Sequence, residues 1–195
     1  MTVELYWQET KRQWNVPNVL TMSRAVTGIA LPLFWYGGPW WLVGAIVFAG
    51  VSDGLDGYLA RKLKTETPIG GVLDPLADKV FTDFFLLGLA FTEISIWFSV
   101  LAVVTILYDI DNTYQRRGDI VTAFRGTSVP PTKPVTKLSK VKTALLFFVM
   151  AVVVLYPGYL AAYVPYVALE LLALLALSLV VASWALNRQQ LFRAT

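Results

Sequence analysis

Six apolar segments constrain this sequence of 195 residues more than any other feature, because each is close to the ~20 residues that a helix needs to cross a bilayer. They lie at about 17–36, 40–60, 72–93, 95–113, 138–157 and 162–186. A hydrophobic content of 56% and a mean hydropathy of +0.60 are typical of membrane proteins. We therefore expect an all-α integral membrane protein whose six transmembrane helices form a single domain, residues 15–195.

The amino-terminal residues 1–14 carry aromatic side chains next to charged ones. Trp7 and Trp14 share this stretch with Lys11 and Arg12. Such a mixture is typical of an amphipathic helix that lies in the membrane interface. We expect an interfacial helix ahead of the transmembrane domain, with a disordered tail as the alternative.

The basic residues indicate which ends of the spans face the cytoplasm. With six spans, both termini and the connections 61–68 and 114–137 lie on one side, and all sixteen Lys and Arg lie there or in the nearest span ends. The opposite turns, around 37–39, 94 and 158–161, carry none. The positive-inside rule therefore assigns the basic side to the cytoplasm or its equivalent, in a bacterial plasma membrane or a mitochondrial inner membrane.

Four aspartates form two pairs, and each pair has the spacing of one helix face. Asp53 and Asp56 are three residues apart, and Asp74 and Asp78 are four apart. Two facing helices would bring four carboxylates to one point, where they would repel one another unless cations were present. Because the chain has no His and no Cys, oxygen ligands suited to Mg²⁺ or Mn²⁺ rather than zinc are predicted. The site is expected at the basic end of the second and third spans.

Ion pairing is the alternative interpretation of these acidic residues. The four aspartates could form interhelical salt bridges with Lys79, Arg61 and Arg24, but the carboxylates outnumber the nearby cations, so we favour the metal site. Asp83 and Asp109 each lie alone in an apolar run. For these two, ion pairing or helix packing is as good an explanation as catalysis.

Small residues accompany the aspartates. Gly57 and Ala60 lie on the helix face of the first aspartate pair. They either pack spans together or leave room for a flat ligand against the backbone, and we favour the second interpretation. Gly70 and Gly71 are also explained as turn residues.

The spacing of these residues resembles the signature of the CDP-alcohol phosphotransferases. The string D-x2-D-G-x2-A-R-x8-G-x3-D-x3-D is matched by Asp53, Asp56, Gly57, Ala60, Arg61, Gly70, Asp74 and Asp78. NVPNVLTMSR at 15–24, LDPLADK at 73–79 and SKVKTAL at 139–145 are similar to the branch that contains phosphatidylglycerophosphate synthases and CDP-type cardiolipin synthases. The resemblance extends from about residue 15 to 150.

This resemblance implies a membrane enzyme, often a homodimer, that holds two divalent cations and transfers the phosphatidyl group of CDP-diacylglycerol to an acceptor hydroxyl with loss of CMP. By position it implies that the four aspartates bind the metal ions and that Asp78 is also the general base. Gly57, Ala60 and Arg61 would contact the CDP portion, together with Asp53 and Gly70. No nucleic acid partner is expected.

The proposed chemistry also suits the residue types themselves. Expulsion of CMP develops negative charge on phosphoryl oxygens, and paired divalent ions stabilise such charge. Without His, a carboxylate near the metal ions is the natural proton acceptor. A lipid donor accounts for a site at a membrane surface.

The acceptor is either glycerol 3-phosphate or phosphatidylglycerol, and both are anionic. Six basic residues are candidates for its phosphate: Lys137, Lys140, Lys142, Arg116, Arg117 and Arg24. The positive-inside rule and attraction to anionic lipids explain most of these charges equally well. A compact basic patch favours glycerol 3-phosphate. Tyr108 and Asp109 stand where both branches usually carry Arg followed by an acidic residue, so an acceptor contact at that position is in doubt.

Other classes of protein fit the sequence less well. Membrane prenyltransferases also bind diphosphate through aspartate-bound Mg²⁺, but they need two separated aspartate-rich motifs and usually more spans. A cation transporter would need carboxylates near the middle of the membrane with access from both sides. A non-enzymatic scaffold would not require the complete aspartate set.

Overall fold

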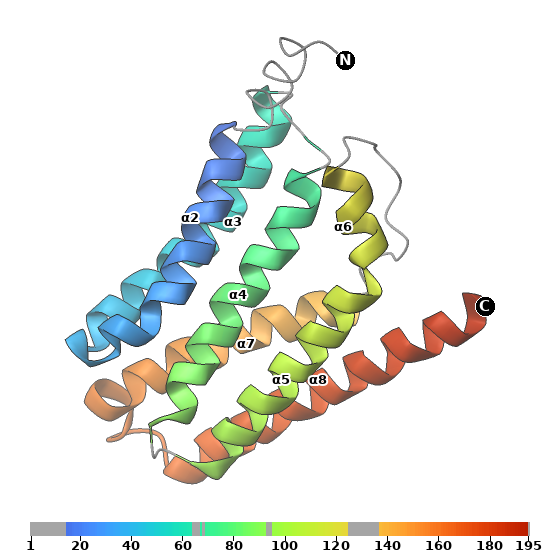
Figure 1. Cartoon of the computed structure of the whole chain (residues 1–195). Helices are drawn as coiled ribbons and strands as arrows, with labels where there is room; N and C mark the ends of the chain where they lie inside the picture. Colours follow the sequence, from blue (N-terminus) through green and yellow to red (C-terminus); the bar gives the residue numbers. More distant parts are fainter. Residues whose placement is uncertain (1–14, 64–66, 68, 93–94, 125–136, 195) are drawn as a thin grey trace.

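The computed structural model describes all residues except 1–14, 64–66, 68, 93–94, 125–136 and 195 (Figure 1). The described residues form helices and no strands, as predicted. In chain order the elements are α2 (Val16–Ala30), η1 (Leu31–Gly37), α3 (Pro39–Leu63), α4 (Gly70–Ala90), α5 (Ile96–Gln115), α6 (Arg117–Phe124), α7 (Lys137–Leu155), η2 (Tyr156–Leu160) and α8 (Tyr166–Ala194). The predicted interfacial helix at 1–14 lies outside the described residues.

Within the described part of the chain, five segments are long and apolar enough to cross a bilayer. They are Val16–Gly37, Pro39–Ala60, Ile96–Gln115, Leu138–Leu160 and Tyr166–Gln190, which correspond to five of the six predicted spans. The sixth, predicted at 72–93, coincides with α4. This helix is long enough, but it is not apolar enough to be counted with the other five, because it carries the charged residues Asp74, Asp78, Lys79 and Asp83. Five apolar helices are therefore established, and a span through α4 stays a prediction.

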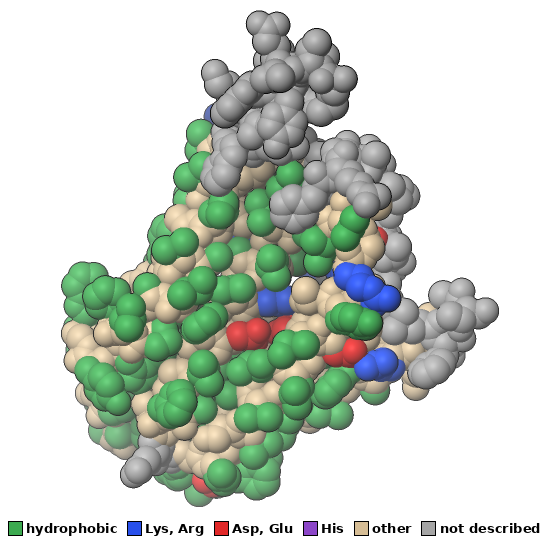
Figure 2. Space-filling view, in the orientation of Figure 1, with side chains coloured by type: hydrophobic (Ala, Val, Ile, Leu, Met, Phe, Trp, Pro, Cys, Tyr) green, Lys and Arg blue, Asp and Glu red, His purple; other side chains and the backbone are tan. Residues whose placement is uncertain are grey.

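The outside of the helix bundle is largely apolar (Figure 2). Val26, Phe48, Leu107, Phe148 and Leu175, from five different helices, all have exposed side chains. A soluble protein rarely exposes so continuous an apolar surface. Together with the apolar helices, this surface supports an integral membrane protein.

Two apolar clusters hold the helices together, and α7 contributes to both. The first joins α4, α5, α7 and α8 through buried residues that include Leu86, Leu101, Val149 and Ala173. The second joins α3, α4 and α7 through residues that include Ala49, Phe81 and Met150. Helix α7 crosses the row formed by α3, α4 and α5 (Figure 1). This crossing brings the basic start of α7 close to the aspartates.

Helices α2 and α4 run in the same direction and approach each other closely (Figure 1). A Cβ at Gly28 would lie 2.6 Å from the Cα of Phe81, which is closer than real Cβ atoms come to a backbone atom. At the start of both helices, a Cβ at Gly70 would lie 2.7 Å from Oδ1 of Asn18. Glycine at these two positions therefore sets the separation of the helices, and the polar side chains of α2 between them face the carboxylates of α4.

Candidate active site

Three of the four predicted aspartates gather around a buried arginine. Nη1 of Arg24 lies 2.9 Å from Oδ1 of Asp53 and 3.2 Å from Oδ1 of Asp78. Its Nη2 lies 3.4 Å from Oδ2 of Asp56. The Arg24 side chain is fully buried, whereas that of Asp53 is 58% exposed. A buried guanidinium needs such partners, and here carboxylates from α3 and α4 provide them.

Thr21, one turn before Arg24 on α2, connects the fourth aspartate. Its Oγ1 lies 2.6 Å from Oδ1 of Asp74 and 3.0 Å from Oδ2 of Asp56. Two side chains of α2 therefore contact all four carboxylates. The structure brings the aspartates together as the spacing predicted, and their role as metal ligands stays a prediction.

The donor set suits a hard divalent cation, although its present spacing suits a guanidinium. Among the described residues, no group of three or more carboxylates stands at the spacing that holds a metal ion. Three of the aspartates instead surround Arg24, so a positive group already occupies their centre. Carboxylate oxygens are the ligands that Mg²⁺ and Mn²⁺ prefer. These residues thus fit such ions by their chemistry, with Arg24 compensating their charge in this arrangement.

The small residues of the signature differ in their surroundings. Gly57 and Ala60 on α3 are partly exposed, which leaves backbone surface accessible beside the aspartates. Gly70 is buried against Asn18, and this close approach accounts for a glycine without any ligand. Arg61 lies on α3, but its side chain is outside the described part of the structure.

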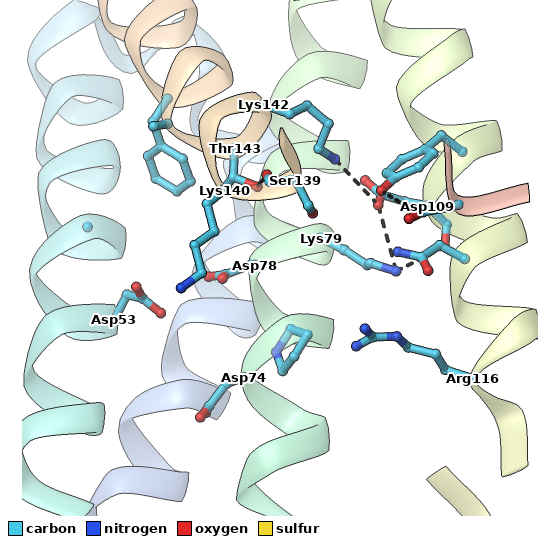
Figure 3. A pocket seen from close by; sticks show the side chains of 17 residues that line it. Asp53, Asp74, Asp78, Lys79, Asp109, Arg116, Ser139, Lys140, Lys142 and Thr143 are labelled. Carbon is cyan, nitrogen blue, oxygen red and sulfur yellow. Dashed lines mark hydrogen bonds and ion pairs between the residues drawn. The ribbon is translucent and has the colours of Figure 1, made fainter. Parts of the chain in front are cut away.

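A cavity of about 610 Å³ opens beside the aspartates, between α3, α4, α5 and α7 (Figure 3). Asp53, Asp74 and Asp78 lie toward α3, and Lys79, Lys142 and Arg116 lie toward α5. Lys140 extends from α7 toward Asp78 (Figure 3). We call Asp53, Asp74 and Asp78 the acidic wall of the cavity, and Lys79, Lys142 and Arg116 its basic wall.

The six predicted phosphate-binding residues do not all lie in one place. Three of them line the cavity: Lys140, Lys142 and Arg116. Arg24 lies among the aspartates instead. The guanidinium of Arg117 stacks on the ring of Tyr114, 4.2 Å from its centroid, and does not line the cavity. The side chain of Lys137 is outside the described part of the structure.

Asp109, for which the sequence did not decide between ion pairing, helix packing and catalysis, forms ion pairs on the basic wall. Its Oδ1 lies 3.7 Å from Nζ of Lys79 and 3.9 Å from Nζ of Lys142. Lys79 also donates hydrogen bonds to the Asp109 carbonyl and to Oγ1 of Thr113. Asp109 therefore connects α4, α5 and α7. Oδ1 of Asp83 is buried and has no hydrogen-bond partner among the described residues.

Thr21, Lys79 and Asn187 are among the residues of this region that were not predicted as site residues. Thr21 and Lys79 both lie in segments that carry the family resemblance, so a signal for them existed. Asn187 lines the cavity from α8. No signal marked it, because the last apolar segment resembles the family only in being apolar.

Comparison with known families and proteins agrees with the resemblance. The family model described as CDP-alcohol phosphatidyltransferase matches residues 14–186, which is most of the chain. The match includes the acidic wall, the basic wall and most of α8.

Curated relatives carry names from two branches. The CDP-diacylglycerol--glycerol-3-phosphate 3-phosphatidyltransferase of Cereibacter sphaeroides is 33% identical over 154 residues, or 74% of this chain and 65% of that protein. A protein of the same name from Pseudomonas fluorescens is 38% identical over 96 residues, or 47% of this chain and 49% of that protein. The cardiolipin synthase (CMP-forming) of Oryza sativa is 43% identical over 70 residues, or 34% of this chain and 21% of that protein. The chain spans less than two thirds of the length of each of these relatives.

Proposed function

This chain belongs to the CDP-alcohol phosphatidyltransferase family, and we propose that it transfers the phosphatidyl group of CDP-diacylglycerol to glycerol 3-phosphate, with release of CMP. The observation that carries the proposal is the cavity whose acidic and basic walls face each other. A diphosphate donor that needs cations and an anionic acceptor that needs basic groups would occupy opposite walls of one such cavity.

The acidic wall supports metal binding. Asp53, Asp56, Asp74 and Asp78 would hold two Mg²⁺ or Mn²⁺ ions, since all are hard oxygen donors brought together by α2. When bound, the ions supply stabilisation of the negative charge that develops on the phosphoryl oxygens.

Asp78 is the proposed general base. Its side chain is 29% exposed and lines the cavity, so a hydroxyl group of the acceptor can reach it. The acceptor oxygen forms a bond to the phosphorus of the phosphatidyl group, the bond from that phosphorus to the oxygen of CMP breaks, and the hydroxyl proton passes to Asp78. No His is available for this step.

The donor would lie along α3. Gly57 and Ala60 leave surface on which the cytidine of the donor can pack, and Arg61 follows Ala60 directly. Asp53 lines the cavity and completes the proposed CDP contacts, whereas Gly70, also expected there, is buried against Asn18. The acyl chains of the donor would extend into the lipid that surrounds the apolar outer surface.

The basic wall supports a phosphate-bearing acceptor. This wall carries three cationic side chains, those of Lys79, Lys142 and Arg116, and Asp109, which pairs with the two lysines, supplies one negative charge. A net positive charge is therefore left to attract a phosphate group. Glycerol 3-phosphate is small enough for this compact group. Phosphatidylglycerol is the second candidate, because relatives named cardiolipin synthase (CMP-forming) match at comparable identity.

The proposed membrane arrangement places the cavity on the cytoplasmic side. Helix α4 would be the sixth span, with Asp74, Asp78 and Lys79 turned toward the cavity and away from lipid. The distribution of Lys and Arg supports this orientation. A homodimer, as the family resemblance implies, completes the proposal.

CMP release tests the function. Purified protein in detergent with Mg²⁺ and CDP-diacylglycerol would be given glycerol 3-phosphate or, separately, phosphatidylglycerol. We expect release with glycerol 3-phosphate. Release with phosphatidylglycerol alone would make the chain a cardiolipin synthase, and no release with either acceptor by folded protein would refute both assignments.

A further inference from the structure

Tyr108 on α5 is a buried tyrosine that is held by α8. It is 1% exposed. Its hydroxyl accepts a hydrogen bond of 3.0 Å from Nδ2 of Asn187 and lies 3.2 Å from Oγ of Ser183. The edge of its ring also packs against Trp184, with 6.4 Å between the ring centroids. The position of the ring is therefore fixed from the side of α8.

The face of the same ring contacts the ammonium group of Lys142 from α7. Nζ of Lys142 lies 4.2 Å from the ring centroid and 3.9 Å from Oδ1 of Asp109. Lys142 is 5% exposed and nevertheless lines the cavity. A buried ammonium is costly unless it has partners, and these two residues of α5 are its partners.

The two partners differ in how far they offset the positive charge of the lysine. A carboxylate neutralises an ammonium group, whereas an aromatic ring attracts it without adding a net negative charge. A lysine that is held by a ring therefore keeps its attraction for an anion. Because a free lysine side chain loses much rotamer freedom when it binds a ligand, fixing it in advance lowers the cost of binding.

We infer that Tyr108 is a positioning residue, which holds the ammonium group of Lys142 toward the cavity so that it binds the phosphate of the acceptor. Asn187 and Ser183 hold Tyr108 in turn, so that α8 takes part in acceptor binding. The inference rests on the proposed function for the presence of a phosphate-bearing acceptor.

The test measures kcat and KM with the full-length protein in micelles that contain CDP-diacylglycerol and Mg²⁺. Tyr108→Leu removes the ring, and we expect the KM for glycerol 3-phosphate to rise about tenfold, as for loss of a desolvated cation–π contact. The kcat and the KM for CDP-diacylglycerol should stay within about twofold. Tyr108→Phe keeps the ring and loses only the hydroxyl contacts with Asn187 and Ser183, so a smaller rise of about threefold is expected.

Arg188→Met is the matched control. It removes an ion pair of 2.7 Å between the same two helices, from Nη2 of Arg188 to Oδ1 of Asp111, and Arg188 does not line the cavity. All three constants should stay near their wild-type values. In a Lys142→Met background, Tyr108→Leu should raise the acceptor KM no further, because the ring then has no ammonium group to hold.

Three results would overturn the inference: an acceptor KM for Tyr108→Leu equal to that of Arg188→Met, an equal rise in KM for both substrates, or a further rise in the Lys142→Met background. If Tyr108→Leu does not fold, as judged by gel filtration and thermal unfolding, Tyr108→Phe decides by the same criteria.

A wild-type protein that is inactive with both acceptors would refute the proposed function separately. The affinity for inorganic phosphate, measured by calorimetry, then decides on Tyr108. Weaker binding by Tyr108→Leu than by Arg188→Met supports its positioning role, and an unchanged or undetectable affinity overturns it.

Discussion

The guanidinium of Arg24 on α2 donates a hydrogen bond of 2.9 Å to Asp53 on α3, although the arginine is fully buried and the aspartate is largely exposed. The bond connects the interior of the bundle with the wall of the cavity. It also makes Arg24 the cation around which the aspartates gather. The stability of this region should therefore depend on Arg24 when no metal ion is bound.

Replacement of Arg24 should destabilise the metal-free protein. Arg24→Met keeps much of the side-chain volume but leaves the carboxylates of Asp53, Asp56 and Asp78 without their shared cation. We expect a loss of about 3 kcal/mol in the free energy of unfolding in EDTA. Added Mn²⁺ should restore part of it, because ligands that bind the folded state stabilise that state.

Arg188→Met is the control for this experiment. Arg188 pairs with Asp111 at 2.7 Å, but its side chain is 50% exposed, and exposed ion pairs contribute little to stability. Thermal unfolding of both variants, with EDTA and with Mn²⁺, gives the comparison. Equal stability of Arg24→Met and the wild type in EDTA would refute the role of Arg24 as the compensating cation.

The close approach of α2 and α4 at Gly28 gives a second prediction. Gly28→Ala places a Cβ against the backbone of Phe81, so the helices must separate. We expect a loss of about 1–3 kcal/mol in stability, as for other overpacked sites. Gly44→Ala is the matched control, since a Cβ there meets nothing within 4 Å and alanine favours the helix. Similar melting temperatures for the two variants would contradict this account of α2–α4 packing.

Asp78→Asn should abolish turnover and leave the protein folded. The amide cannot accept the proton of the acceptor hydroxyl, so we expect kcat to fall at least about 100-fold. Asp111→Asn is the control, because Asp111 pairs with Arg188 and Trp184 and does not line the cavity. Near-normal kcat for folded Asp78→Asn would remove the proposed base.

Asp109→Asn should affect stability more than chemistry. The change leaves the ammonium groups of Lys79 and Lys142 without their shared carboxylate, so a loss of about 3 kcal/mol in the free energy of unfolding is expected. Because Asp109 has no part in proton transfer, kcat should stay well above that of Asp78→Asn. A loss of kcat as complete as that of Asp78→Asn would make Asp109 part of the catalytic machinery.

The sequence predicted the helices and the gathering of the aspartates, because both follow from local periodicity. Apolar length fixed the segments of α3, α5 and α7 to within a few residues. The spacing of Asp53 with Asp56, and of Asp74 with Asp78, required only that two helices face each other. The short helix α6, within the connection 114–137, was not predicted.

The sequence could not decide between possible partners of the charged residues, because these depend on how distant helices pack. Arg24 was a candidate both for ion pairs with the aspartates and for the acceptor phosphate, and the register of α2 against α4 places it among the aspartates. The contact between Lys142 and Tyr108 depends on how the start of α7 packs beside α5. Asn187 reaches the cavity through the packing of α8 on α5, which an apolar pattern does not reveal.

The most direct measurement is the incorporation of radiolabelled glycerol 3-phosphate into lipid by the purified protein, with CMP release followed in the same samples. We expect one labelled lipid for each CMP released when CDP-diacylglycerol and Mg²⁺ are both present. Neither product should appear with EDTA or with Asp78→Asn. Labelled lipid without CMP would contradict transfer of a phosphatidyl group at the cavity between the acidic and basic walls. Amounts of CMP and labelled lipid from Asp78→Asn equal to those from the wild-type protein would contradict it as well.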